Sequence, residues 1–319
     1  MNHNIRAIFL LVAVAGVLQG LSWVLPPYFQ TLLLMVGINA LLAVSLNIVN
    51  GLSGQFSLGH AGFMAIGAYV SASVDTFLLA SWHSTDVGAQ AALVLSLLIG
   101  AFAGAVAGFL VGLPALRLRG DYLAIATLGF GEIIRVVFLN VQSVGGARGM
   151  IGIPQTTTSA LVYLVLGTSV VGIHRFIHSS HGRALLSVRE DEIASSCLGV
   201  NATSYKVGAF TVASALAAVS GGLLAHQMSY INPGMFGFMK SVEVVIMVVL
   251  GGLGSISGSI VAAVILTLLP EVLRPLQDLT GVDLRMVIYS IALIVMMLMR
   301  PDGLFGRKEI WQLAWKRKS

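Results

Sequence analysis

Apolar residues fill most of the chain in long stretches that short polar segments separate. Seven stretches are close to the roughly 20 residues that an α-helix needs to cross the hydrocarbon core of a bilayer. They cover residues 7–25, 29–49, 56–74, 90–113, 122–140, 159–177 and 207–225. Because lipid cannot pair with backbone amides, stretches of this kind predict membrane-spanning helices. The pattern therefore predicts an all-α fold, a polytopic transmembrane helical bundle.

Two further apolar tracts lie near the C-terminus. Residues 242–269 are too many for one comfortable span and are interrupted by glycine and serine at 251–258, so we expect two arms, the first a short re-entrant half-helix or span. Residues 284–299 form a last span before a basic tail at 300–319, which predicts a cytoplasmic C-terminus because Lys and Arg are enriched on that side. We expect about 8–10 spans, with ten leaving both ends cytoplasmic, in one transmembrane domain over 1–319.

Composition supports a membrane protein. The chain is 57% apolar and 10% charged, whereas soluble domains carry roughly a quarter charged residues. The net charge of +5 fits cytoplasmic loops rather than a nucleic-acid surface, because no basic patch with interleaved aromatic residues occurs. The single cysteine, Cys197, excludes an intramolecular disulfide and a cysteine metal cluster. We expect membrane lipid as the surroundings and no nucleic-acid partner.

Enzyme chemistry is not expected of this chain. A Walker A motif needs glycine directly before its lysine, and none of the lysines follows a glycine. These lysines are Lys206, Lys240, Lys308, Lys316 and Lys318. We therefore expect no catalytic residues, no bound cofactor and no metal, and any ATP hydrolysis must occur in separate subunits.

A polar tract between the second and third stretches is the first candidate site. Amide, hydroxyl and imidazole groups at membrane depth are costly unless they have partners or line a wet path. The candidate pathway residues are Asn47, Asn50, Gln55, Ser57 and His60. The alternative is a tight cytoplasmic turn in which Asn and Ser side chains merely cap helix ends. His60 alone does not indicate a metal site.

Glu132 and Arg135 lie three residues apart on one face of a predicted span. Opposite charges at this spacing can neutralise each other, and unpaired charges in a bilayer are expensive. We expect a structural intramembrane ion pair; the alternative is a proton relay, as in an ion-coupled secondary transporter.

A glycine repeat runs along the stretch 90–113, at Gly100, Gly104, Gly108 and Gly112. Small residues at this spacing form a smooth stripe on which another helix can pack closely. We expect packing inside the chain, with a subunit interface as the alternative.

The polar segment 182–206 contains signals for a short helix. Ser187 and Glu190 have the spacing of a capping box, Asp191 and Glu192 suit the positive end of a helix, and Gly199 suits its C-terminus. The predicted helix has about 11 residues and is too short to span a bilayer.

The short helix would carry an apolar stripe that includes Ile193 and Leu198. An apolar stripe among charges either lies on the membrane domain or docks into a groove of a partner protein. The residues alone leave both possibilities open.

Four stretches carry a family resemblance: 50–63, 118–135, 182–201 and 300–306. With them the chain resembles the LivM-type permeases of branched-chain amino-acid ABC importers over nearly its whole length. The resemblance implies a bacterial cytoplasmic (inner) membrane protein that works with three kinds of partner component. These are a second related permease subunit, two cytoplasmic ATPase subunits that bind ATP and Mg, and an extracytoplasmic solute-binding protein.

The resemblance also implies that residues 182–206 are a cytoplasmic coupling segment that contacts the ATPases. Arg189, Glu190, Asp191 and Glu192 match the charged run of the family, whereas 195–197 depart from it. The implied ATPase-coupling residues are Ser187, Arg189, Glu190, Asp191, Glu192, Ile193, Leu198 and Gly199.

The resemblance implies Leu, Ile and Val as solutes, delivered by the binding protein. Urea and short-chain amides remain alternative solutes, because their importers use very similar permeases. An ion-coupled secondary transporter is the alternative from another class. The sequence leaves open the exact solute, the gate and whether the permease pair is homo- or heterodimeric.

Overall fold

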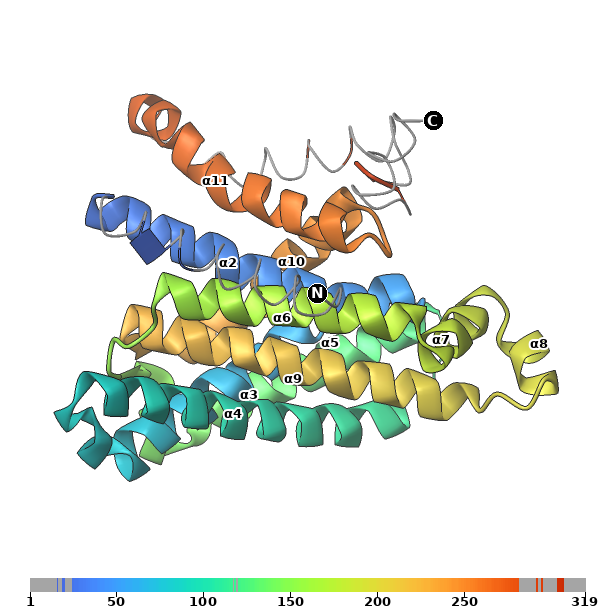
Figure 1. The fold of residues 1–319 in the computed structure, drawn as a ribbon, viewed down its shortest axis with the longest axis horizontal. Coiled ribbons are helices and arrows are strands. Elements are labelled where there is room, and N and C mark those ends of the chain that lie inside the picture. Colours follow the sequence, from blue (N-terminus) through green and yellow to red (C-terminus); the bar gives the residue numbers. More distant parts are fainter. Residues whose placement is uncertain are drawn as a thin grey trace, which may run out of the picture.

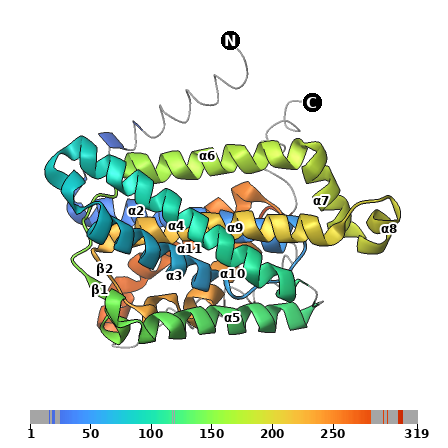
Figure 2. The same cartoon turned by 90° about the horizontal axis from the view of Figure 1, so that it is seen from below.

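The computed structural model describes residues 25–116, 118, 120–280 and 303–306, with the isolated positions 16, 19, 20, 291 and 294. Most of these residues are helical, and a bundle of long helices runs along the longest axis of the molecule (Figures 1 and 2). The long helices are α2 (Pro27–Asn47), α3 (His60–Ser73), α4 (Asp86–Ala115), α5 (Asp121–Asn140), α6 (Ser159–His178), α9 (Ala202–Met228) and α11 (Ile256–Thr280). The all-α bundle is confirmed.

Shorter elements connect these helices. They are α7 (Ser180–Glu190), α8 (Glu192–Cys197) and α10 (Phe238–Gly251), the π-helical turns η1 (Ile48–Leu52) and η2 (Val74–Leu78), and the 3₁₀ turns Ala80–Ser84, Gln142–Val144, Gly146–Arg148 and Pro233–Phe236. Strands β1 (Met150–Ile151) and β2 (Tyr230–Ile231) pair antiparallel. The pairing ties the segment after α5 to the segment after α9.

Six helical stretches of the described residues are long and apolar enough to cross a membrane. They are Pro27–Leu52, His60–Leu78, Asp86–Ala115, Asp121–Asn140, Ser159–His178 and Ala202–Met228. Each matches one of the stretches predicted from the sequence. The predicted spans at 7–25 and 284–299, and most of the basic tail, lie outside the described residues.

Helices α3, α4 and α9 pack closely because small residues line their contacts. The glycine stripe of α4 is buried, and a Cβ atom at Gly104 would collide with Ala218 of α9. A Cβ at Gly108 would likewise lie 2.5 Å from Cβ of Ser214 on α9. Without a Cβ the two backbones approach and gain van der Waals contact. The stripe therefore packs inside the chain, as expected.

The tract 242–269 forms two arms, as expected. Helix α10 ends at Gly251 and α11 begins at Ile256, with positive φ at Gly252 and Gly254 in the turn between them (111° and 92°). With 14 residues, α10 is about 21 Å long and too short to cross the hydrocarbon core. The segment 303–306 lies at its end, because Leu304 N donates to Leu250 O (2.9 Å) and pairs a last-turn carbonyl.

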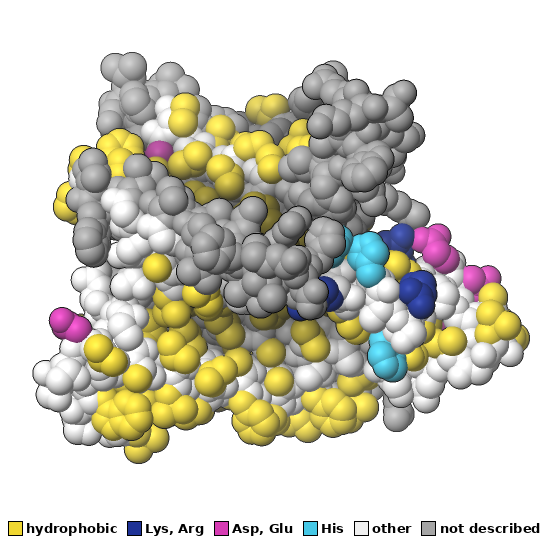
Figure 3. All heavy atoms as spheres, in the orientation of Figure 1, with side chains coloured by type: hydrophobic (Ala, Val, Ile, Leu, Met, Phe, Trp, Pro, Cys, Tyr) yellow, Lys and Arg dark blue, Asp and Glu magenta, His cyan; other side chains and the backbone are white. Residues whose placement is uncertain are grey.

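Helices α7 and α8 project from one end of the bundle (Figures 1 and 2). Charged side chains and histidines gather over this end, whereas the visible face of the bundle is largely apolar (Figure 3). This distribution fits a membrane-embedded bundle with a polar segment outside the hydrocarbon region.

The capping box predicted at Ser187 and Glu190 is wrong. Both residues lie in the last turns of α7, where Ser187 Oγ donates to Ala184 O. Helix α7 begins earlier because Ser179 Oγ accepts a hydrogen bond from Gly182 N (3.1 Å) and caps it there. The predicted 11-residue helix is consequently divided between α7 and the six residues of α8.

Candidate functional site

The polar tract interrupts the helical path between α2 and α3. After Asn47 the chain makes the π-helical turn η1, runs irregularly over 53–59 and becomes helical again at His60. Its five candidate side chains are all buried, at 0–6% exposure. Buried polar side chains are tolerated only where they find partners or line a wet path.

Asn47 joins the tract to the break between α10 and α11. Its Oδ1 accepts a hydrogen bond from Gly254 N (2.9 Å), and its Nδ2 donates to Ser255 O (2.9 Å). The two backbones lie so close that a Cβ atom at Gly51 would collide with Gly254. The two glycine-rich interruptions of the bundle therefore form one junction, which we call the glycine junction (47–54 and 251–258).

Asn50 and Ser57 are only partly satisfied. Asn50 Oδ1 accepts from Ser57 N (3.1 Å), while Asn50 Nδ2 and Ser57 Oγ are buried and form no hydrogen bond with the described residues. A buried polar atom without a partner costs about 1–3 kcal/mol. These atoms are chemically suited to bind water or a passing polar solute.

Gln55 and His60 have partners close by. Gln55 Oε1 accepts from Ser53 Oγ (3.1 Å), and His60 Nε2 lies 2.7 Å from Ser45 Oγ of α2. No group of three His, Cys, Asp or Glu side chains in the described part of the chain is arranged to hold a metal ion. His60 is thus placed as a polar contact between α2 and α3.

Arg189 brings the segment 182–206 to the glycine junction. One guanidinium nitrogen, Nη1, donates to Gly51 O at 2.7 Å, and the other, Nη2, donates to Glu190 Oε1 at 2.7 Å. Gly54 has φ of +69°, and a Cβ atom there would lie 2.6 Å from Arg189 Cγ. The glycine at 54 both permits this turn and leaves room for the arginine stem.

The stretch 118–135 also meets the polar tract. Thr127 Oγ1 accepts from Leu58 N (3.1 Å), and a Cβ atom at Gly59 would collide with Thr127 O. Arg189, in the stretch 182–201, bonds to Gly51 O, and Phe305, in the stretch 300–306, donates its backbone N–H to Gly251 O. Each of the four stretches that carry the family resemblance therefore reaches the glycine junction or the polar tract next to it. Segments from distant parts of the sequence therefore form one site.

Glu132 and Arg135 form the predicted ion pair, with 2.6 Å between Glu132 Oε2 and Arg135 Nε. A second pair, Lys240 and Glu243 on α10, has the same spacing and an N–O distance of 3.1 Å. Both pairs line one cavity of about 500 Å³ between α5 and α10. Sequence reasoning missed Lys240, although the spacing of Lys240 and Glu243 repeats that of Glu132 and Arg135.

Helix α8 presents apolar side chains at its surface. Ile193 and Leu198 are 71% and 84% exposed. Asp191 begins the helix, because its Oδ1 accepts from Ile193 N and Ala194 N (2.9 and 3.0 Å). An ion pair of 2.8 Å between Glu192 and Lys206 holds α8 to α9.

Gly199 has φ of +83° directly after the last turn of α8. This left-handed conformation favours glycine and ends helices commonly. Two of the predicted signals in this segment lie at the ends of a helix. Asp191 and Glu192 are at the start of α8, and Gly199 follows its end.

Comparison with known proteins identifies the family. Residues 28–298 match the family described as branched-chain amino acid transport system / permease component. The chain belongs to this permease family. It is 37% identical to the high-affinity branched-chain amino acid transport system permease protein LivM of Salmonella typhimurium, over 85% of this chain and 68% of that protein. No solved structure is significantly similar.

Two other relatives show how the family varies. LivM of Escherichia coli is 36% identical, over 83% of this chain and 67% of that protein. The permease protein LivH of Salmonella typhimurium is 27% identical, over 85% of this chain and 92% of its own length. The chain is thus a multi-pass membrane permease that is similar to both kinds of subunit and more similar to LivM.

Sequence reasoning missed a buried acid–histidine cluster in this permease. Asp75 of η2 is fully buried, with Oδ2 3.2 Å from His226 Nε2 of α9 and Oδ1 3.3 Å from His83 Nε2. Asp75 directly follows the predicted span 56–74, and His83 lies in the polar segment after it. A pair separated by 151 positions leaves no local signal.

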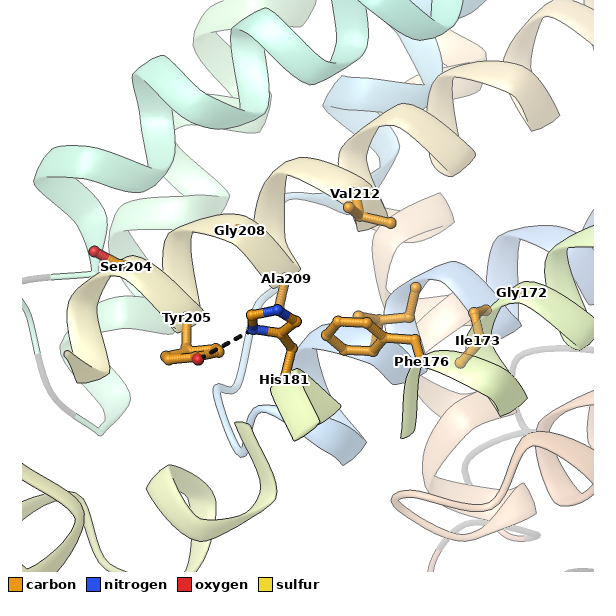
Figure 4. Close-up of a pocket in the computed structure, with 10 residues that line it drawn as sticks. Gly172, Ile173, Phe176, His181, Ser204, Tyr205, Gly208, Ala209 and Val212 are labelled. Atoms are coloured by element: carbon orange, nitrogen blue, oxygen red, sulfur yellow. Dashed lines mark hydrogen bonds between the residues drawn. The ribbon is translucent and has the colours of Figure 1, made fainter. Parts of the chain in front are cut away.

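An apolar cavity of about 360 Å³ lies where α6, α7 and α9 of the permease meet. Figure 4 shows His181 of α7 and Tyr205 of α9 facing each other, with Phe176 of α6 and Val212 of α9 also lining the cavity. His181 Nδ1 lies 3.3 Å from Tyr205 Oη. The described lining contains no Asp, Glu, Lys or Arg, so this cavity offers no ionic partner for a charged solute.

Proposed function

We propose that the chain is a membrane-spanning subunit of an ATP-driven importer that translocates Leu, Ile and Val across the bacterial cytoplasmic membrane. The names of its relatives support the solute class. The largely apolar bundle supports a translocating role rather than a catalytic one. Solute would arrive from an extracytoplasmic binding protein.

The complex would contain two permease subunits and two ATPases. Similarity to both LivM and LivH supports a second, related permease beside this chain. ATP and Mg would bind in the cytoplasmic ATPases, since no lysine of this chain follows a glycine.

The hydrogen bond from Arg189 to Gly51 O carries this proposal. The exposed Ile193 and Leu198 of α8 offer an apolar contact for an ATPase. Movement of α8 and α7 would pass through Arg189 to the glycine junction, where Asn47 links it to the break after α10. ATPase closure would thereby alter the polar tract that lines the path.

Reconstitution tests the proposal. The permease, a related second permease, the ATPase subunits and the binding protein are incorporated in liposomes, and uptake of radiolabelled leucine is followed with and without ATP. We expect uptake to require ATP and every subunit, and the purified chain alone to hydrolyse no ATP. Uphill leucine uptake by this chain alone, driven by an ion gradient, would refute the proposal in favour of a secondary transporter.

A further inference from the structure

A cavity of about 500 Å³ opens between α5 and the first turns of α10. Glu132 and Arg135 of α5 and Lys240 and Glu243 of α10 contribute to its wall, and their side chains are 19–36% exposed. We propose that this cavity binds the solute as an α-amino-acid zwitterion; the inference rests on the proposed transport function and names the solute site within it.

The charges of the cavity suit a zwitterion. Among the described residues, two carboxylates and two cationic groups line it, so the charge of this described lining is balanced. A zwitterion supplies one carboxylate and one ammonium group and can pair with both kinds of group. A solute with a net charge would bring an uncompensated charge into this balanced lining, and an uncharged amide or urea would not repay desolvation of two ion pairs.

The start of α10 would receive the carboxylate of the solute. Phe238 and Met239, in its first turn, line the cavity, and Gly237 before them provides no side-chain cap. First-turn amides of a helix attract anions. Lys240 and Arg135 add positive charge there, since Arg135 Cδ would lie 3.8 Å from a Cβ atom at Gly237.

Lys240 is held in place by a neighbouring helix. Its Nζ donates to Asn39 Oδ1 of α2 at 3.1 Å, and Asn39 Nδ2 donates to Thr267 Oγ1 of α11 at 3.0 Å. A cation held by second-layer hydrogen bonds loses little conformational entropy when a ligand binds.

Glu132 and Glu243 would receive the ammonium group, each beside the cation with which it is paired in the free cavity. Apolar residues contribute to the wall as well. Met235, Val242 and Ile246 line the cavity beside the charged groups. An apolar surface with a few convergent polar groups is the usual composition of a ligand pocket, and its volume is in the usual range of roughly 300–1,000 Å³. A branched aliphatic side chain would lie against these residues.

The site lies at the opposite end of α10 from the glycine junction. Lys240 lies eleven positions before Gly251, which ends the helix, so the two are about 16 Å apart along the axis. A rigid helix of this length connects the solute cavity with the loop that Asn47 contacts.

Binding to the purified full-length chain in nanodiscs tests the inference. Radiolabelled L-leucine is displaced with unlabelled leucine, isovalerate, isoamylamine and acetamide. We expect leucine to displace, and the analogues that lack the ammonium or the carboxylate group to bind roughly ten- to hundredfold more weakly, as expected for loss of a charged hydrogen bond. Displacement by acetamide or isovalerate as effective as displacement by leucine would overturn the inference.

Variants separate the cavity from other sites. Glu243→Gln removes one ammonium partner, and the double change Lys240→Glu with Glu243→Lys keeps an ion pair but reverses its direction. We expect both to weaken leucine binding at least about tenfold, while Asp86→Asn, an exposed carboxylate at the start of α4, leaves it unchanged. Wild-type affinity in the folded double variant would overturn the inference.

Uptake by the reconstituted complex distinguishes this inference from the proposed function. ATP-dependent leucine uptake that is unaffected by both cavity variants would refute the cavity as solute site and leave the transport function standing. ATP-dependent uptake of acetamide or urea without leucine uptake would refute the solute class of both.

Discussion

One hydrogen bond of Arg189 joins α7 to the carbonyl of Gly51, which lies 138 positions earlier in the sequence. Its side chain is 17% exposed, although α7 projects from the end of the bundle. A guanidinium in this position can hold a backbone carbonyl and Glu190 at once, because its donors form a fixed planar fork. Arg189 is therefore a positioning residue between α7 and the polar tract.

Replacing Arg189 should uncouple ATP hydrolysis from transport. Arg189→Ala removes a charged hydrogen bond that contributes about 1.5–3 kcal/mol, so movement of α7 would no longer reach the glycine junction. We expect leucine uptake by the reconstituted complex to fall at least tenfold while the ATPases still copurify and hydrolyse ATP. Arg189→Lys should restore part of the uptake, because it keeps the charge but not the fork.

Arg183→Ala is the matched control for Arg189. Arg183 lies on the same helix, and its Nη1 bonds locally to His178 O. We expect near-normal uptake in this variant. An equal loss in both variants would mean that charge on α7, and not the bond to Gly51, is what matters.

Individual site residues were predictable where their type is unusual for their surroundings. Asn47, Asn50 and Ser57 are conspicuous because amides and hydroxyls are expensive between apolar spans. Lys240 and Asp75 were not found, since each lies near the predicted end of a span, where a charge is ordinary. Burial of Asp75 depends on His226, which the fold alone brings near.

At the scale of elements, the glycine stripe of α4 determines how close α9 approaches. Gly104→Ala should destabilise the protein by about 1–3 kcal/mol, the usual effect of overpacking, because the added Cβ would collide with Ala218. The measurement is thermal unfolding of the purified chain in detergent.

Gly129→Ala on α5 is the comparison. A Cβ atom at Gly129 would have no neighbour within 4 Å, and alanine favours a helix over glycine by up to about 1 kcal/mol. We expect unchanged or higher stability. If Gly104→Ala is as stable as Gly129→Ala, the contact of α4 with α9 is not close in the folded protein.

Helix α8 should be the part that an ATPase contacts. Ile193→Asp or Leu198→Asp would place an unpaired charge in an apolar groove of the partner, where its desolvation is costly. We expect reduced ATPase copurification and reduced solute-stimulated ATP hydrolysis, with normal membrane insertion. Thr203→Asp adds the same charge in the first turn of α9 and should have little effect.

Full ATPase association and coupling in both Ile193→Asp and Leu198→Asp would show that α8 lies on the membrane surface instead. The exposure of Ile193 and Leu198 is compatible with either contact. Copurification therefore decides between the two interpretations that the sequence left open.

Helices were predicted well because their length and apolarity are local properties. The described spans begin and end within several residues of the predicted ones. The division of 180–199 into α7 and α8 was not predicted, because two competing caps occur there. Ser179 starts a helix before the expected box, and Asp191 interrupts it with an extended backbone (φ −154°, ψ 109°).

At the scale of the whole molecule, the sequence identified the class of fold but not its internal junctions. Apolar stretches predict a bundle, and glycines at 251–258 predict the break after α10. Nothing local indicates that this break lies against the polar tract, because Asn47 and Gly254 are 207 positions apart. The four resemblance stretches meet only once the helices have packed.

The hydrogen bond from Asn47 to Ser255 can form only after both residues have been synthesised. The two residues are 208 positions apart, and at a synthesis rate of about 5–20 residues per second the second follows the first by roughly 10–40 s. During this interval the side-chain amide of Asn47, at the end of α2, lacks the backbone groups of Gly254 and Ser255 to which it bonds in the folded protein. A polar group in that position favours helix association in lipid but also exposes an unfinished chain to quality control.

A truncated chain that ends at residue 236 lacks α10, α11 and the turn between them, and so lacks the partners of Asn47. We therefore expect it to be short-lived in the membrane. We expect Asn47→Leu to lengthen its half-life in a pulse-chase experiment, because leucine needs no partner, and to shorten that of the full-length protein. If the truncated chain has the same half-life with Asn47 as with Asn47→Leu, the unpaired amide is not the cause of its degradation. Because Gly254 and Ser255 are synthesised late, the side-chain amide of Asn47 finds its backbone partners only in a permease whose turn between α10 and α11 has been made.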